Sequence, residues 1–107
     1  MEDDVWTWLS KILSAMAHPT RLKILALCSE KERTRKELRE ALKISKPLLL
    51  AHLKILKSAG FIEERTIIDE ERLVIKRLCR TRDFEIKLSP EFFRKLLQKP
   101  DKRPGLN

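Results

Sequence analysis

The sequence predicts a mostly α-helical domain with a small β-hairpin, in the order α-α-α-α-β-β-α. Three observations predict this fold: four apolar-periodic segments begin at capping residues, two β-prone runs follow Gly60, and a last capped segment follows Ser89. The third and fourth segments are short and separated by a tight turn, and the hairpin follows at once. That order is typical of a winged helix-turn-helix, in which the hairpin is the wing.

The first helix is expected to begin after Asp3 or Asp4 and to run to about Ala17. Its apolar stripe is wide for a peripheral helix. Pro19 begins a second helix, 19–29, that has almost no polar face. We therefore expect it to be the central helix of the core.

A third helix is expected at 35–42, because Thr34 and the glutamate three residues later form a capping box. A fourth is expected at about 46–59, between the N-cap Ser45 and a closing glycine. At 100° per residue its apolar arc contains Leu48, Leu49, His52, Leu53, Ile55, Leu56 and Ala59. The opposite arc contains Lys46, Pro47, Leu50, Ala51, Lys54, Lys57 and Ser58. A helix of this kind can lie in a DNA major groove with its ammonium groups on phosphates, but a solvated lysine face on an ordinary helix has the same pattern.

The wing is expected from two β-prone runs, 61–68 and 72–78, joined by the acidic tip Asp69, Glu70 and Glu71. Phosphates repel carboxylates, so the tip is expected to stay out of a DNA groove. The strands are expected to approach the flanking phosphates with Arg65, Arg72, Lys76 and Arg77.

Residues 84–88 alternate between apolar and polar, which predicts a short extended segment. Ser89 caps a last helix, which ends before Pro100. Residues 1–98 are expected to form one DNA-binding and dimerisation domain, followed by a disordered basic tail at 99–107. The terminal helices carry more apolar side chains than a small domain needs, which predicts a homodimer interface of Val5, Trp6, Trp8, Leu9, Ile12, Phe92, Phe93, Leu96 and Leu97.

The 107 residues include 24 Lys and Arg against 16 Asp and Glu, and the net charge of +8 favours a polyanionic partner such as double-stranded DNA. No run of 18 apolar residues occurs, and the N-terminal Met-Glu-Asp-Asp has the wrong charge for a signal peptide. We therefore expect a cytoplasmic protein without a membrane partner.

Neither a catalytic site nor a cofactor is expected, because the sequence has no Gly-rich loop, no paired carboxylates in an apolar run and no nucleophile-base pattern. His18 and His52 lack ligand partners at metal-binding spacing, so core or capping roles are expected for them and no metal is expected. Cys28 and Cys79 are interpreted as small buried hydrophobes, and a disulfide between them stays open.

Two strings resemble the ArsR-type winged helix-turn-helix transcription regulators: residues 13–25, LSAMAHPTRLKIL, and residues 52–62, HLKILKSAGFI. Residues 46–53, KPLLLAHL, look closer to the archaeal members, and the resemblance covers roughly 9–88. It implies a homodimer, usually a repressor, that places two recognition helices in successive major grooves. The metal-sensing motifs of the family are absent, because 35–42 contains no Cys or His and the last helix has only Glu91 where a carboxylate and histidine pair would be needed.

The candidate DNA-binding residues belong to the two-helix unit and the wing: Thr34, Arg35, Lys36, Ser45, Lys46, Pro47, Leu50, Ala51, Lys54, Lys57, Arg65, Arg72, Lys76 and Arg77. Pro47, Leu50 and Ala51 offer few hydrogen bonds to base edges, so direct readout is expected to be sparse. Two alternatives to a sequence-specific regulator therefore stay open. One is a weakly selective chromatin-type DNA-binding protein, and the other is a protein-interaction module that exposes Leu48 and Leu50.

Overall fold

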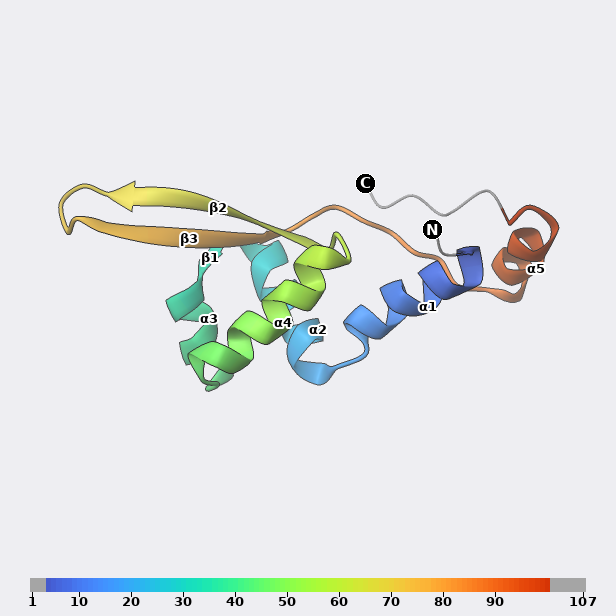
Figure 1. Ribbon diagram of the computed structural model, residues 1–107, viewed down its shortest axis with the longest axis horizontal. Coiled ribbons are helices and arrows are strands. Elements are labelled where there is room, and N and C mark those ends of the chain that lie inside the picture. The colour runs from blue at the N-terminus through green and yellow to red at the C-terminus, as the bar shows by residue number, and fades with distance from the viewer. Residues whose placement is uncertain (1–3, 101–107) are drawn as a thin grey trace.

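A computed structural model describes residues 4–100 and confirms the predicted order of elements, with one addition (Figure 1). The helices are α1 (Val5–Met16), α2 (Pro19–Glu30), α3 (Arg35–Leu42), α4 (Lys46–Ser58) and α5 (Pro90–Gln98). The hairpin strands are β2 (Ile62–Asp69) and β3 (Val74–Thr81). The addition is the two-residue strand β1 (Arg33–Thr34), which pairs with β3 and gives an antiparallel sheet of order β1-β3-β2. Two residues are too few to show an alternating pattern, so periodicity does not predict β1.

The helices begin at capping side chains, as local sequence signals predict. Asp4 Oδ1 accepts a hydrogen bond from the Thr7 N–H at 2.7 Å, and Thr34 forms the predicted capping box with Glu37. Ser45 and Ser89 cap α4 and α5 in the same way. These caps satisfy backbone donors that each helix start would otherwise leave unpaired.

The main core lies where α2, α4 and the base of the hairpin meet. Its fully buried side chains include Ile24, Leu38, Leu53 and Phe61. Helix α2 contacts α1, α3, α4 and β3, which confirms that it is central. Beyond β3, the chain is not a hydrogen-bonded strand over 84–88, yet Phe84 packs on Phe61 with ring centroids 4.7 Å apart. This segment is therefore held by side-chain packing rather than by a strand ladder.

A second, smaller cluster joins the two terminal helices. Val5, Leu9 and Leu96 are buried there, with Trp8, Leu13 and Phe92 packed around them. We call this pair of helices the α1–α5 arm. The molecule is elongated, 57 × 28 × 24 Å, and Figure 1 shows the arm at one end and the hairpin at the other.

Candidate nucleic-acid interface

A three-residue turn joins α3 to α4 and sets the direction in which α4 begins. Lys43 adopts the left-handed backbone conformation, with φ of 55°, and its N–H donates to the Arg39 carbonyl. Ser45 Oγ then accepts from the Leu48 N–H and starts α4. The turn and the cap join α3 and α4 into the predicted helix-turn-helix.

Helix α4 buries a narrower stripe than the predicted apolar arc. Its buried side chains lie at i, i+3, i+4 and i+7: Leu49, His52, Leu53 and Leu56. Leu48 and Ile55 were predicted to be buried, but 47% and 40% of their surfaces are exposed. Leu50 was predicted to face outward, but it is half-buried and packs against the core. A single α-helix contacts the core along one stripe. For residues about 90° from the centre of that stripe, burial depends on the neighbouring elements rather than on periodicity.

The outward surface of α4 is formed by Pro47, Ala51, Lys54 and Ser58, all of which are exposed. Only Lys54 in this set is charged. This surface therefore offers few groups that can read base edges.

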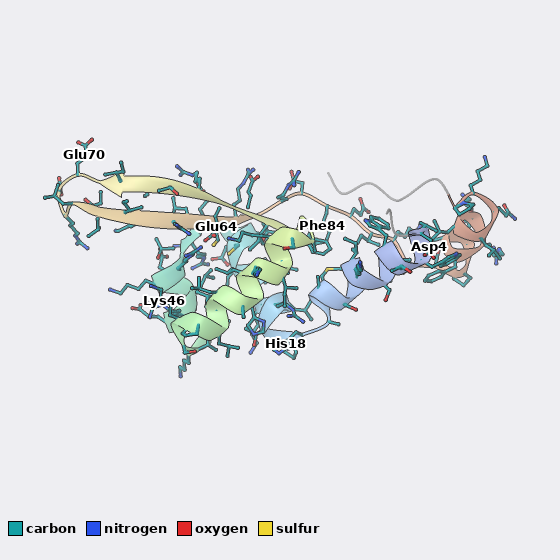
Figure 2. All side chains as sticks on the ribbon, in the orientation of Figure 1. Asp4, His18, Lys46, Glu64, Glu70 and Phe84 are labelled. Carbon is teal, nitrogen blue, oxygen red and sulfur yellow. The ribbon has the colours of Figure 1, made fainter. Side chains whose placement is uncertain are left out.

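The hairpin turn is Glu70–Leu73, so it begins one residue later and ends two residues later than the predicted tip. The ladder runs from Ile62 opposite Thr81 to Asp69 opposite Val74, so Asp69 belongs to β2. Arg72 was predicted on a strand, but it lies in the turn, where its N–H donates to Asp69 Oδ1 at 3.2 Å. Figure 2 shows Glu70 at the end of the hairpin that is farthest from the α1–α5 arm.

A groove of about 750 Å³ lies between α3, the first residue of α4 and the outer half of the hairpin. Seven of the predicted DNA-binding residues line it: Thr34, Arg35, Lys36, Lys46, Arg72, Lys76 and Arg77. Arg39 and Ile75 line it as well, while Glu37 and Glu40 are its carboxylates. We call this the basic groove. Arg39 was missed by the sequence analysis, although its position four residues after Arg35 places it on the same face of α3.

The predicted basic residues fall into two groups according to their partners. Arg35 and Lys57 bind Glu64, and Arg65 makes a bidentate pair with Glu32 at 2.8 and 2.9 Å. Lys76 and Arg72 lie 3.6 and 4.0 Å from Asp69. Lys36 has only a 4.0 Å contact with Glu40 on its own helix. In contrast, Lys46, Lys54 and Arg77 form no ion pair with any residue in 4–100.

Glu64 is a carboxylate with donors from three other elements, α3, α4 and β3. Burial would raise its pKa, but the hydrogen bonds from Arg35, Lys57 and Cys79 outweigh burial and lower the pKa from 4.5 to about 2. The side chain is therefore ionised throughout the physiological range. Sequence reasoning did not single out Glu64, because its partners come from distant parts of the chain.

The histidines and cysteines have structural positions. His18 Nδ1 caps α2 by accepting from the Thr20 N–H at 3.1 Å, and the His52 ring lies 4.6 Å from the His18 ring. Burial, with the nearby charges of His18 and Arg21, lowers the pKa of His52. Cys28 and Cys79 are buried free thiols, and burial raises the pKa of Cys28 to about 11. Within residues 4–100 no three potential metal ligands cluster.

The predicted dimer residues divide between buried and exposed positions. Val5, Leu9, Ile12 and Leu96 are buried within the chain, so their side chains are not the free apolar surface that was predicted. Their burial follows from the packing of α5 on α1 and of α1 on the main core. Trp8 and Phe92 are half-buried. The exposed part consists of Trp6, Phe93 and Leu97, at 41%, 40% and 70%.

The structure tests only part of two further predictions, the C-terminal tail and the absence of a membrane partner. The predicted tail at 99–107 lies outside the described residues from position 101 onward. Across the described part of the chain, every helix is too short or too polar to cross a membrane.

Comparisons with known proteins match the chain to regulatory proteins. Residues 18–64 match the arsR family of bacterial regulatory proteins, and this range spans α2, α3 and α4. An uncharacterized HTH-type transcriptional regulator of Methanocaldococcus jannaschii is 28% identical over 88 residues, which is 82% of this chain and 90% of that protein. The HTH-type transcriptional repressor SmtB of Mycobacterium tuberculosis is 42% identical over 52 residues, which is 49% of this chain and 38% of SmtB.

Solved structures show the same similarity. HlyU from Vibrio cholerae matches with a TM-score of 0.63 and 25% identity, over 87% of this chain and 95% of HlyU. The names of the Methanocaldococcus jannaschii protein and of SmtB both state a role in transcriptional regulation.

Proposed function

We propose that this chain, an ArsR-type winged helix-turn-helix transcriptional regulator, is a homodimeric repressor that binds double-stranded DNA with α4 in the major groove. The observation that carries the proposal is the basic groove beside the exposed face of α4. The groove gathers cations from α3, α4 and the hairpin on one side of the molecule. Clustered cations on one face are the electrostatic footprint of a DNA-binding protein.

Within this proposal, the cations without partners do most of the phosphate binding. Lys46 at the start of α4, Lys54 in its middle and Arg77 on β3 lie around the presumed duplex. Ser45, Pro47 and Ala51 then approach the base edges, where an alanine methyl can contact a thymine methyl. Thr34, Lys36, Arg72 and Lys76 are proposed as further backbone contacts from the groove walls.

Repression is proposed because a bound dimer would cover its operator and block other proteins there. The name of SmtB, a repressor, supports this role, and binding to chromosomal DNA would place the protein in the cytoplasm. No cofactor and no metal enter the proposal.

The first prediction tests DNA binding and the role of Lys46. Binding to a duplex should weaken steeply as salt rises, because phosphate contacts release counterions. Replacing Lys46 with alanine should weaken binding to all sequences alike and reduce the salt slope by about one unit. Fluorescence anisotropy with labelled duplexes between about 0.05 and 0.2 M salt measures both effects. Absence of duplex binding even at about 0.05 M salt would refute the proposal and favour a protein-interaction module.

A weakly selective chromatin-type protein is the second candidate, because the exposed face of α4 has few hydrogen-bonding side chains. The two candidates differ in the ratio of specific to random-sequence affinity. A regulator is expected to show a ratio of about 10³ or more for its selected operator. A ratio near one for the best selected sequences would favour the weakly selective chromatin-type protein.

The second prediction concerns the homodimer. The exposed side chains of the α1–α5 arm, Trp6, Phe93 and Leu97, form the proposed contact. Replacing Phe93 and Leu97 with serine should shift the mass in solution from dimer to monomer, because the interface loses its apolar area. Light scattering after size-exclusion chromatography measures the shift. Changing the exposed Leu73 at the hairpin turn to serine is the matched control, since it removes apolar surface far from the arm. A wild-type protein that is monomeric at micromolar concentration would contradict the prediction.

A further inference from the structure

The carboxylate of Glu64 lies where α3, α4, β2 and β3 meet, between the hairpin and the two helices (Figure 2). Oε1 accepts from Arg35 Nη2 at 2.7 Å and from Lys57 Nζ at 2.8 Å. Oε2 accepts from Arg35 Nε at 2.9 Å and from Cys79 Sγ at 3.1 Å. An ionised carboxylate has about four acceptor positions, so its hydrogen-bonding capacity is filled. Only 8% of the side chain is exposed.

This arrangement changes what two basic residues can do. Arg35 is the first residue of α3 and Lys57 lies in the last turn of α4, and both are candidate phosphate ligands by sequence. Reaching a phosphate would require each of them to give up a short charged hydrogen bond to a buried carboxylate, and if both left, Glu64 would have no cationic partner. Leaving a buried charge unpaired is strongly unfavourable. Lys54, one turn earlier on α4, has no such competing partner among the described residues.

The same bonds connect the wing to the helix-turn-helix. Glu64 is the third residue of β2, and the fourth donor, Cys79, lies directly opposite it on β3. Arg35 and Lys57 therefore attach α3 and α4 to the base of the hairpin through one side chain. Hydrogen bonds between charged partners are about twice as strong as neutral ones and restrict geometry.

We propose that Glu64 is a positioning residue for DNA binding, which withholds Arg35 and Lys57 from the phosphates and fixes the wing against the two helices. The inference rests on the proposed function. Because phosphate contacts carry no sequence information, withholding two cations lowers the affinity for all DNA sequences alike, whereas the fixed position of the wing affects the selectivity. The protein thus binds DNA with fewer phosphate contacts than its basic residues would allow.

The first experiment compares Lys54→Gln with Lys57→Gln, two lysines on the same helix. The salt slope of binding to random-sequence duplex is measured by fluorescence anisotropy. Lys54→Gln is expected to reduce the slope by about 0.9 per neutralised phosphate, whereas Lys57→Gln is expected to leave it unchanged. An equal loss of slope in both variants would overturn the inference.

The second experiment compares Glu64→Gln with Glu63→Gln. Both remove one negative charge at neighbouring positions of β2, but Glu63 is exposed and pairs with Arg80. Glu64→Gln is expected to steepen the slope by about one to two units, because it releases Lys57 and Arg35 toward phosphates. It is also expected to lower the ratio of operator to random-sequence affinity, because the wing is no longer fixed against α3 and α4. Glu63→Gln is expected to leave the ratio unchanged.

The outcomes distinguish a failure of the proposed function from a failure of the inference about Glu64. If the wild type binds no DNA at any salt concentration, the proposed function fails. If the wild type binds and Glu64→Gln behaves like Glu63→Gln in both slope and ratio, the inference fails while the function stands. Circular dichroism melting of each variant reports folding, and the two lysine variants decide the question if Glu64→Gln does not fold.

Discussion

Replacing Glu64 with alanine is expected to lower the free energy of unfolding by about 2–3 kcal/mol. Breaking a buried ion pair typically costs about 3–5 kcal/mol. The loss expected here is at or below the lower end of that range, because Arg35 and Lys57 keep 22% and 38% of their side-chain surfaces exposed to water. Urea unfolding followed by circular dichroism measures the change. Glu63→Ala is the control, because exposed ion pairs contribute about 1 kcal/mol or less. Equal destabilisation by the two substitutions would contradict the prediction.

The same carboxylate makes stability sensitive to acid in a defined window. The pKa of Glu64 is about 2 in the folded chain and is taken as 4.5 when the chain is unfolded. A carboxyl group with a lowered folded-state pKa stabilises the fold above its unfolded pKa and loses that contribution as the pH falls. Wild-type stability should therefore decline between about pH 4.5 and pH 2, and Glu64→Gln should lack that part of the decline.

Changing Glu70 and Glu71 together to lysine is expected to strengthen binding to random-sequence DNA by roughly tenfold at about 0.15 M salt. The wild-type turn places two exposed carboxylates at the end of the hairpin, where they repel a nearby duplex. The substitution removes this repulsion and adds attraction, without creating contacts to base edges. Sequence preference should therefore stay the same.

A matched control separates contact from overall charge. Changing Glu85 and Glu91 to lysine alters the charge equally, but these exposed residues lie outside the hairpin and the basic groove. At about 0.15 M salt the screening length is about 8 Å, so distant charges contribute little. Arg72→Ala, which removes a cation from the groove, should weaken binding. Equal binding by wild type and the Glu70 and Glu71 variant would show that the hairpin turn lies far from DNA.

The helix starts and the hairpin could be predicted from the sequence, because they depend on interactions between residues close together in the chain. The capping box of Thr34 and Glu37 and the cap at Ser45 involve side chains within three residues of the backbone groups they bind. Gly60, with φ of 84°, follows the end of α4 as its position in the sequence indicates. These features depend on short spacing, so no knowledge of the remaining fold is required.

The candidate site was only partly readable. Basic residues on α3, at the start of α4 and on the hairpin were found from charge and periodicity, and the fold gathers seven of the predicted residues in one groove. Periodicity placed Leu50 outward and Leu48 inward, and the structure places them the other way, because neighbouring elements decide the flanks of a helix. Charge alone also ranked Lys57 with Lys54, although only Lys57 reaches Glu64.

By itself, the sequence determined the order of the elements, the caps and the basic character of the helix-turn-helix, because each depends on residues within a few positions of one another. The tertiary structure alone decided which cations remain available. Glu64 lies 29 residues from Arg35 and 15 from Cys79, and Arg65 lies 33 residues from Glu32. Such pairs form only when packing of the core brings distant segments together, and no local pattern in the chain encodes that distance.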